Sequence, residues 1–283
     1  MKKVLVLLSL VGVICGNLSA NGLRDFDFSK TRVDIAMGGG FDLETNEYPF
    51  VGALYGSFKE DHYASKYDHK NIAFCTVALV SPSLVMTSSK CAAEAKIYGK
   101  DLFISFSKNN IAKILSGELS QNNNNIRRIM IHPESSKTEF NRFNLSLIKL
   151  EKPQKNITPI KLPKFPLVVP NKKGIWISLG LLNDEDKTLP NRFQTANVEQ
   201  KECSDKEGSL ASLTCFEGID GYARYKAGDD GSLFLGMTSK GFTLFGIAVA
   251  SNKEKEMYTI PVSNDDNWVA RYIKKDLFDA QNQ

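Results

Sequence analysis

Histidine is scarce in this chain: its 283 residues include only three, His62, His69 and His132. Chemistry that needs several imidazoles has little to draw on, and a histidine-rich metal site is nearly excluded. The charge balance is weak, since 36 basic and 32 acidic residues give +4. Lys2 and Lys3 lie in a segment that we expect to be removed, which leaves 34 basic residues and +2. So small a charge gives no reason to expect nucleic acid or a membrane as partner.

The chain also lacks a long hydrophobic run at its start. The apolar stretch from Val4 to Cys15 is too short for a transmembrane helix, which needs about 20 residues. It follows a basic pair and precedes the small-residue stretch Gly16 to Ala20, the order found in a secretory signal peptide. We therefore predict a signal peptide over residues 1–20 and a secreted, extracellular protein.

Cysteine is sparse as well. With Cys15 inside the predicted signal peptide, four cysteines remain: Cys75, Cys91, Cys203 and Cys215. An even number in an exported chain predicts two disulfides.

From Tyr48 onward, short apolar runs alternate with polar turns. Many are rich in β-branched or aromatic residues and few are long enough for a helix, which predicts an all-β sandwich or a pair of barrels. The runs are 50–55, 74–80, 84–87, 102–106, 126–131, 145–150, 175–179, 232–237, 242–250 and 257–262.

The proline-rich stretch from Pro159 to Lys173 predicts an extended connector between two halves. The barrels would span about 37–158 and 174–263. Apolar residues at helical spacing then predict a C-terminal helix over about 264–276, followed by a tail at 277–283.

One segment carries a family resemblance. The stretch from Cys75 to Cys91, CTVALVSPSLVMTSSKC, resembles without a gap the strand pair of trypsin-like serine proteases that runs from Cys-Gly-Gly-Ser-Leu-Ile to Thr-Ala-Ala-His-Cys. The spacing, Pro82, Thr87 and both cysteines match. Five further stretches follow in the family's order: Met37–Gly40 with Pro49–Phe50, Ile131–Pro133, Asn144–Leu150, Gly228–Ser232, and Met257–Thr259 with Trp268.

The chain is accordingly identified as resembling the trypsin-like family over residues 37–276, after an N-terminal extension at 21–36. The resemblance implies an all-β fold of two six-stranded antiparallel β-barrels with a C-terminal helix. It also implies disulfides between Cys75 and Cys91 and between Cys203 and Cys215.

The same resemblance places Lys90 at the catalytic histidine position, Asn144 at the aspartate position and Asp230 at the serine position. Acyl-serine chemistry needs a serine oxygen, an imidazole to take its proton and a carboxylate to orient the imidazole. All three are replaced, so we expect no enzymatic activity and no cofactor or metal. We expect Lys90 and Asp230 to face one another as an ion pair instead.

Other departures agree with this expectation. Ala36 precedes the mature start at Met37, so trypsin-like activation is not available at the matching bond. Arg224 lies at the floor of the relic specificity pocket, where trypsin-like members carry an acid. Two N-glycosylation sequons begin at Asn144 and Asn156; Asn144 should face the relic site, whereas Asn156 lies in a predicted turn and is the candidate for modification.

The leading hypothesis is a secreted pseudoprotease that binds an extracellular protein (a protease, an inhibitor or a defence component). It would act as cofactor, decoy or inhibitor in an extracellular protease cascade or defence process. One alternative is a hydrolase with altered chemistry that uses Asp230 with Lys90. Another is a structural or storage protein without a specific partner.

Overall fold

The structure is a computed structural model that describes residues 41–42, 47–58, 71–106, 111, 114, 116, 124–135, 141–165, 173–179, 192–203, 213–219, 223, 225, 229–239, 241–251 and 256–282. The predicted signal peptide, the extension at 21–36, the start at Met37 and the pocket residue Arg224 lie outside these ranges.

The first barrel is closed, with strand order β2-β3-β4-β7-β6-β5 and antiparallel pairs throughout. Apolar side chains fill it, and every residue of β3 and β4 is buried. Its strands are β2 (Val51–Phe58), β3 (Ile72–Ser81), β4 (Leu84–Ser88), β5 (Gly99–Ser105), β6 (Asn124–Ile131) and β7 (Leu145–Leu150).

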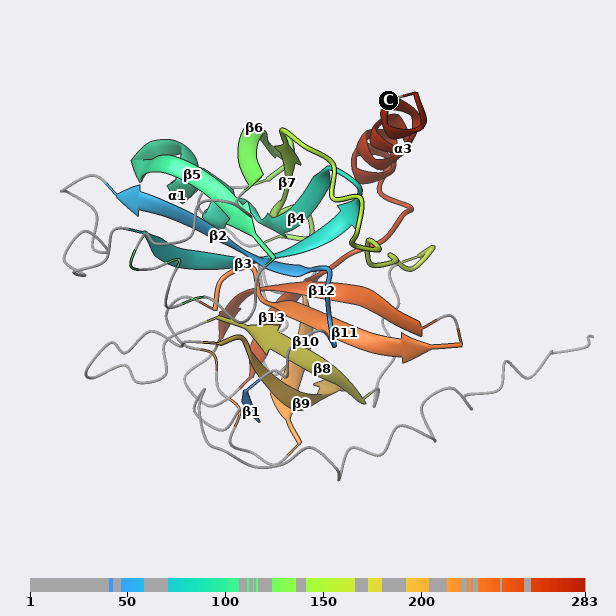
Figure 1. The fold of residues 1–283 in the computed structure, drawn as a ribbon. Coiled ribbons are helices and arrows are strands. Elements are labelled where there is room, and N and C mark those ends of the chain that lie inside the picture. Colours follow the sequence, from blue (N-terminus) through green and yellow to red (C-terminus); the bar gives the residue numbers. More distant parts are fainter. Residues whose placement is uncertain are drawn as a thin grey trace, which may run out of the picture.

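The second barrel closes through the pairing of β8 with both β9 and β11, in the order β8-β9-β10-β13-β12-β11. Its strands are β8 (Lys173–Ser178), β9 (Gln194–Lys201), β10 (Thr214–Gly218), β11 (Leu233–Thr238), β12 (Gly241–Ser251) and β13 (Met257–Pro261). The two six-stranded barrels confirm the predicted fold class. They lie one above the other in Figure 1.

One short strand departs from the predicted division of the chain. Strand β1 (Phe41–Asp42) falls in the segment assigned to the first barrel, but it pairs with β9 of the second sheet, Phe41 opposite Thr195. It pairs with the first residues of β9, Gln194 and Thr195, whereas β10 pairs with the later residues, Val198 to Lys201. Phe41 and Asp42 therefore belong to the second sheet, although they precede the first barrel in sequence.

The barrels share one hydrophobic core, since buried residues of both belong to a single contiguous cluster. The connector contributes to it: Ile160 and Leu162 are buried, and the Leu244 amide donates to the Lys161 carbonyl at 2.9 Å. The described part of the connector also forms a parallel bridge between Lys161 and Thr243.

Both predicted disulfides are confirmed. Cys75 on β3 pairs with Cys91, with Cα atoms 6.0 Å apart, and Cys203 pairs with Cys215 on β10, with Cα atoms 5.1 Å apart. Both separations lie in the normal range for disulfides. The first bond ties the start of helix α1 (Ser89–Tyr98) to the barrel wall.

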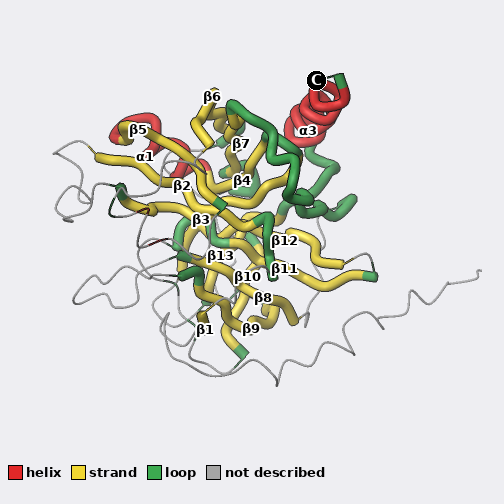
Figure 2. Tube along the Cα trace, in the orientation of Figure 1, coloured by secondary structure: helices red, strands yellow, loops and turns green. Residues whose placement is uncertain are grey.

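The C-terminal helix α3 (Asn267–Gln281) is present, but it begins later and ends later than predicted. The carboxylate of Asp266 caps it by accepting the amides of Trp268 and Val269, which sets the first residue at Asn267. The helix follows the second barrel in sequence, yet it packs beside the first, as Figures 1 and 2 show.

The contact with the first barrel centres on Asp276, which is 2% exposed. Its carboxylate accepts the Ser81 hydroxyl at 2.6 Å and the Ser83 amide and hydroxyl at 2.9 and 2.7 Å. The ammonium of Lys149 on β7 pairs with the same carboxylate. Four donors on three residues thus hold one buried charge, and they fix the helix to the barrel.

Candidate functional site

Lys90 lies in the first turn of α1, directly after β4. Ser88 caps this helix, because its hydroxyl accepts the Cys91 amide at 3.2 Å. A cation is unfavourable at the positive end of a helix, and the first turn of α1 contains no acidic residue. Lys90 therefore needs a carboxylate from elsewhere in the fold.

Asp230 supplies that carboxylate from the loop before β11. Its Oδ2 lies 2.6 Å from Lys90 Nζ, and its Oδ1 accepts the Tyr225 hydroxyl at 2.7 Å. The predicted Lys90–Asp230 ion pair is confirmed, and it links the two barrels. The side chain of Lys90 is 50% exposed and that of Asp230 only 13%, so the carboxylate lies on the inner side of the pair.

Protonation in this cluster, the Lys90–Asp230 site, follows from burial and from the neighbouring charges. Burial lowers the pKa of Lys90, but the charge of Asp230 and its hydrogen bond outweigh burial, and the pKa is raised above its usual value. Burial also raises the pKa of Tyr225 well above normal, and Asp230 raises it further. Both groups therefore keep their protons near neutral pH and donate them to Asp230.

Glu94 is the second acid of the site, one turn after Lys90 on α1. Burial raises its pKa; the positive charge of Lys90 lowers it, and the charge of Asp230 raises it again, with a net upward shift. Sequence reasoning missed both Glu94 and Tyr225. Glu94 is four residues after Lys90, so a predicted helix at α1 would have placed the two side chains on one face. No sequence signal indicates the contact between Tyr225 and Asp230.

The preceding acid, Asp229, belongs to a separate buried network. It is 1% exposed, and its Oδ1 accepts the hydroxyl of Ser178 at the end of β8. The oxygen of Ser232 lies 2.5 Å from that of Ser178, and Ser232 is fully buried. The carboxylates of the two adjacent aspartates therefore accept hydrogen bonds from different residues, Asp229 from Ser178 and Asp230 from Lys90 and Tyr225.

Asn144 lies just before β7 and is 5% exposed. Its carbonyl accepts the Ser89 amide at 2.8 Å, and its side-chain Oδ1 accepts the Ser135 hydroxyl at 3.3 Å. The backbone thus brings Asn144 next to the first residue of α1, beside Lys90, as the triad positions imply. A buried side-chain amide is a poor glycosylation acceptor, whereas Asn156 is exposed in a turn.

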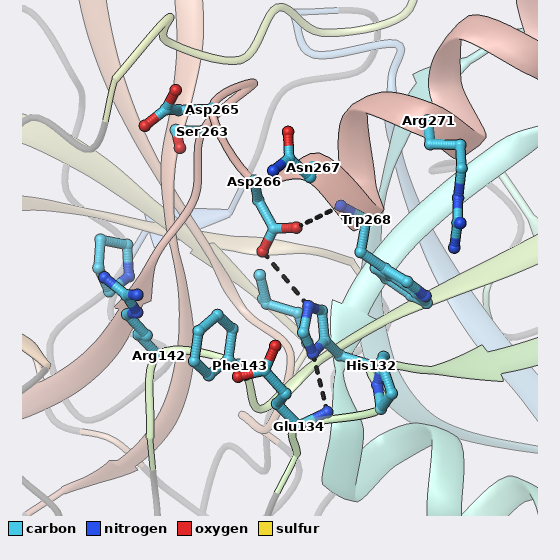
Figure 3. A pocket seen from close by; sticks show the side chains of 13 residues that line it. His132, Glu134, Arg142, Phe143, Ser263, Asp265, Asp266, Asn267, Trp268 and Arg271 are labelled. Carbon is cyan, nitrogen blue, oxygen red and sulfur yellow. Dashed lines mark hydrogen bonds and ion pairs between the residues drawn. The ribbon is translucent and has the colours of Figure 1, made fainter.

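The imidazole of His132, in the motif Ile131–Pro133, makes structural contacts. It is 3% exposed; Nδ1 accepts the Glu134 amide at 3.1 Å, and Nε2 lies 3.5 Å from Asp266 Oδ2. Its ring stacks on Phe143 with centroids 4.8 Å apart. Figure 3 shows these contacts in a pocket of about 660 Å³ between the β6–β7 connection and the start of α3.

Within the described ranges, no three histidine, cysteine, aspartate or glutamate side chains are grouped to hold a metal ion. Over the same residues, no helix has the length and apolar character needed to span a bilayer. His62, His69 and Gly228 lie outside the part of the chain that the structure describes.

A double-mutant cycle should detect the Lys90–Asp230 pair. We expect Lys90→Met and Asp230→Asn each to destabilise the protein, with Lys90→Met the milder because it also removes a cation from the helix start. The double variant should lose about 0.5–1 kcal/mol less than the sum, a value typical of a half-exposed pair. Urea unfolding would measure this, with Lys96→Met on the same helix as control. Strictly additive losses would show that the pair contributes no interaction energy.

The comparisons with known proteins agree with this geometry. The sequence model of the family described as Trypsin matches residues 38–269. None of the curated proteins compared with the chain matches it. Because the matched region covers most of the sequence and both barrels, the chain belongs to the trypsin-like serine protease family.

Proposed function

We propose that this family member is secreted, does not cleave peptide bonds and acts by binding an extracellular protein. The observation that carries the proposal is the 2.6 Å contact between Lys90 Nζ and Asp230, at the positions where the family's mechanism requires an imidazole and a serine hydroxyl. A proton-transfer pair is thereby replaced by an ion pair.

Neither partner is suited to take over the chemistry. A lysine that acts as a base needs a lowered pKa, and the pKa of Lys90 is raised. Both carboxylate oxygens of Asp230 already accept hydrogen bonds, from Lys90 and from Tyr225. The neighbouring hydroxyl of Ser232 is buried in the Asp229 network. These contacts argue against a hydrolase with altered chemistry.

Binding is the use that this scaffold retains. Two closed barrels, two disulfides and an anchored C-terminal helix hold the surface loops on a rigid frame. Disulfides are typical of extracellular proteins. The roles that fit are cofactor, decoy or inhibitor for a protease, an inhibitor or a defence component outside the cell.

The test is capture from the extracellular fluid of the source, followed by titration of the captured protein with purified chain. We expect one partner to bind stoichiometrically to the folded chain and not to chain that has been reduced and unfolded. Failure to find a stoichiometric partner would favour a storage or structural role. Turnover of peptide or ester substrates that disappears in Asp230→Asn would contradict the proposal.

Passage through a eukaryotic secretory pathway should lead to N-glycosylation at one of the two sequons. Asn156 and Thr158 are exposed in the turn after β7, whereas Asn144 is buried. We expect a glycosidase-sensitive mass shift in the secreted protein that Asn156→Gln abolishes. Ser146→Ala, which removes the sequon at Asn144, should leave the mass shift unchanged. If Ser146→Ala abolished the shift and Asn156→Gln did not, Asn144 would be the modified residue.

A further inference from the structure

Strand β6 presents two consecutive arginines to solvent, which a regular strand does not do. Side chains normally alternate between the two faces of a strand. Here the register shifts between Ile126 and Arg128, so that Arg127 and Arg128 together oppose one residue of β7. Such a β-bulge redirects side chains. Both arginines are exposed, and both line the same hollow between β6 and α3.

The bulge places like charges together at a cost. Arg128 pairs across the strands with Lys149, and facing cations destabilise a sheet. Asp276 from α3 neutralises Lys149. Within the described part of the chain, no carboxylate lies within ion-pair distance of Arg127 or Arg128. Their charge is left available to a ligand.

Further cations on α3 extend this surface. Lys275 lines the same hollow as the two arginines, and it also lines the adjoining hollow with Arg271 and Lys274. All three are exposed, and among the described residues none of them has a carboxylate partner. We call the surface formed by Arg127, Arg128, Lys149, Arg271, Lys274 and Lys275 the basic groove. The acids that line the two hollows are Asp276, engaged by Lys149, and Asp279.

We propose that the basic groove binds a linear sulfated polysaccharide. Guanidinium groups bind oxyanions through paired hydrogen bonds, and two of them, on β6, line the hollow together with the ammonium group of Lys275 on α3. Leu84, Met130 and Tyr272 also line this hollow.

Two observations favour this ligand over other polyanions. A bilayer surface requires a broad apolar face, but Leu84 and Met130 are buried in the hollow, and the exposed large apolar residues described on α3 are the two neighbours Leu277 and Phe278. Single-stranded nucleic acid requires exposed aromatic rings for base stacking, and Tyr272 is partly buried under Arg271.

The test is calorimetric titration of the full chain with a heparin-derived hexasaccharide. Arg127→Ser/Arg128→Ser should weaken binding about 10-fold or more and flatten its salt dependence. The matched control is Lys164→Ser/Lys173→Ser, which removes two exposed cations outside the groove and should change affinity less than about 2-fold. The arginine variant should keep its melting temperature, because it relieves the repulsion with Lys149.

Every other outcome overturns the proposal. Equal losses of affinity in both double variants would show that the hexasaccharide is held by the overall positive charge and not by the basic groove. No binding of the hexasaccharide to the parent chain, or equal binding of the unsulfated polymer hyaluronan, would exclude sulfate recognition. Tighter binding of phosphatidylserine vesicles or of a single-stranded oligonucleotide would assign the groove to those polyanions. None of these results depends on whether the chain cleaves peptides.

Discussion

Asp276→Asn should lower the free energy of unfolding by about 3 kcal/mol or more, the largest effect that we expect from one side chain. The substitution keeps the shape of the side chain and removes its charge, which leaves Lys149 with a side chain only 22% exposed and no carboxylate partner of its own. The Ser81 and Ser83 donors would face an amide instead of a carboxylate. Urea unfolding followed by tryptophan fluorescence would measure the loss.

The same carboxylate predicts a pH dependence. Burial raises the pKa of Asp276, but the hydrogen bonds from Lys149, Ser81 and Ser83 outweigh burial, and the pKa is lowered. The stabilisation is therefore complete above the unfolded value of about 4 and is lost as pH falls through the lowered folded value. The difference between parent and Asp276→Asn should shrink below about pH 4. Asp279→Asn, three residues further along the helix, should cost little; an equal loss would refute the anchoring role.

Gly231→Ala should destabilise the protein by about 3 kcal/mol, from two separate causes. Gly231 has φ +79°, a conformation that costs an L-residue about 1–2 kcal/mol. A Cβ there would also meet the Thr87 hydroxyl and lie 2.6 Å from the Thr76 carbonyl, inside the wall of the first barrel. Overpacking of this kind typically costs about 1–3 kcal/mol. Because Gly231 follows Asp230, the displaced loop should also lose the contact with Lys90.

Gly241→Ala is the matched control. Gly241 has φ +92°, but a Cβ at this position would meet nothing within 4 Å. Gly241→Ala should therefore destabilise the protein only through the unfavourable backbone conformation, by about 1–2 kcal/mol. The difference between the two melting curves isolates the crowding against Thr87 and Thr76. Equal losses would show that the loop can move away from the barrel without penalty.

Much of the fold could be predicted, because the apolar runs indicated most of the strands and the spacing of the motifs indicated the family. The cysteines, Pro82 and the ordered motifs led to two barrels, both disulfides and the Lys90–Asp230 pair. The ion pair was predictable because the triad positions converge in this fold whatever residues occupy them. That reasoning used position only, and it therefore found no residue outside the motifs.

Elements with few large apolar residues were missed. Strand β9 alternates regularly between buried and half-buried positions, but its buried residues include Gln194 and Gln200, so no apolar run marks it. Strand β10 has only Cys215 and Phe216 as large apolar residues. Helix α1 was missed because alanines and cysteine make up much of its buried face.

The C-terminal anchor shows a further limit. Asp276 lies between lysine and leucine in a helix, and nothing in the sequence distinguishes it from a solvated surface acid. Its burial follows from tertiary packing, since its partners come from two separate places in the first barrel: Ser81 and Ser83 at the turn between β3 and β4, and Lys149 on β7. The late end of α3 has the same cause, because a helix anchored at Asp276 extends past it.

The central claim is that an ion pair has replaced the nucleophile and base, and an active-site probe tests it most directly. A serine-directed fluorophosphonate reacts only with an activated hydroxyl. The nearest serine after Asp230, Ser232, is buried and hydrogen-bonded to Ser178. We predict no labelling of the purified chain, before or after treatment with trypsin, while active trypsin labels fully in a parallel sample. Stoichiometric labelling of any serine near Asp230 would contradict the account.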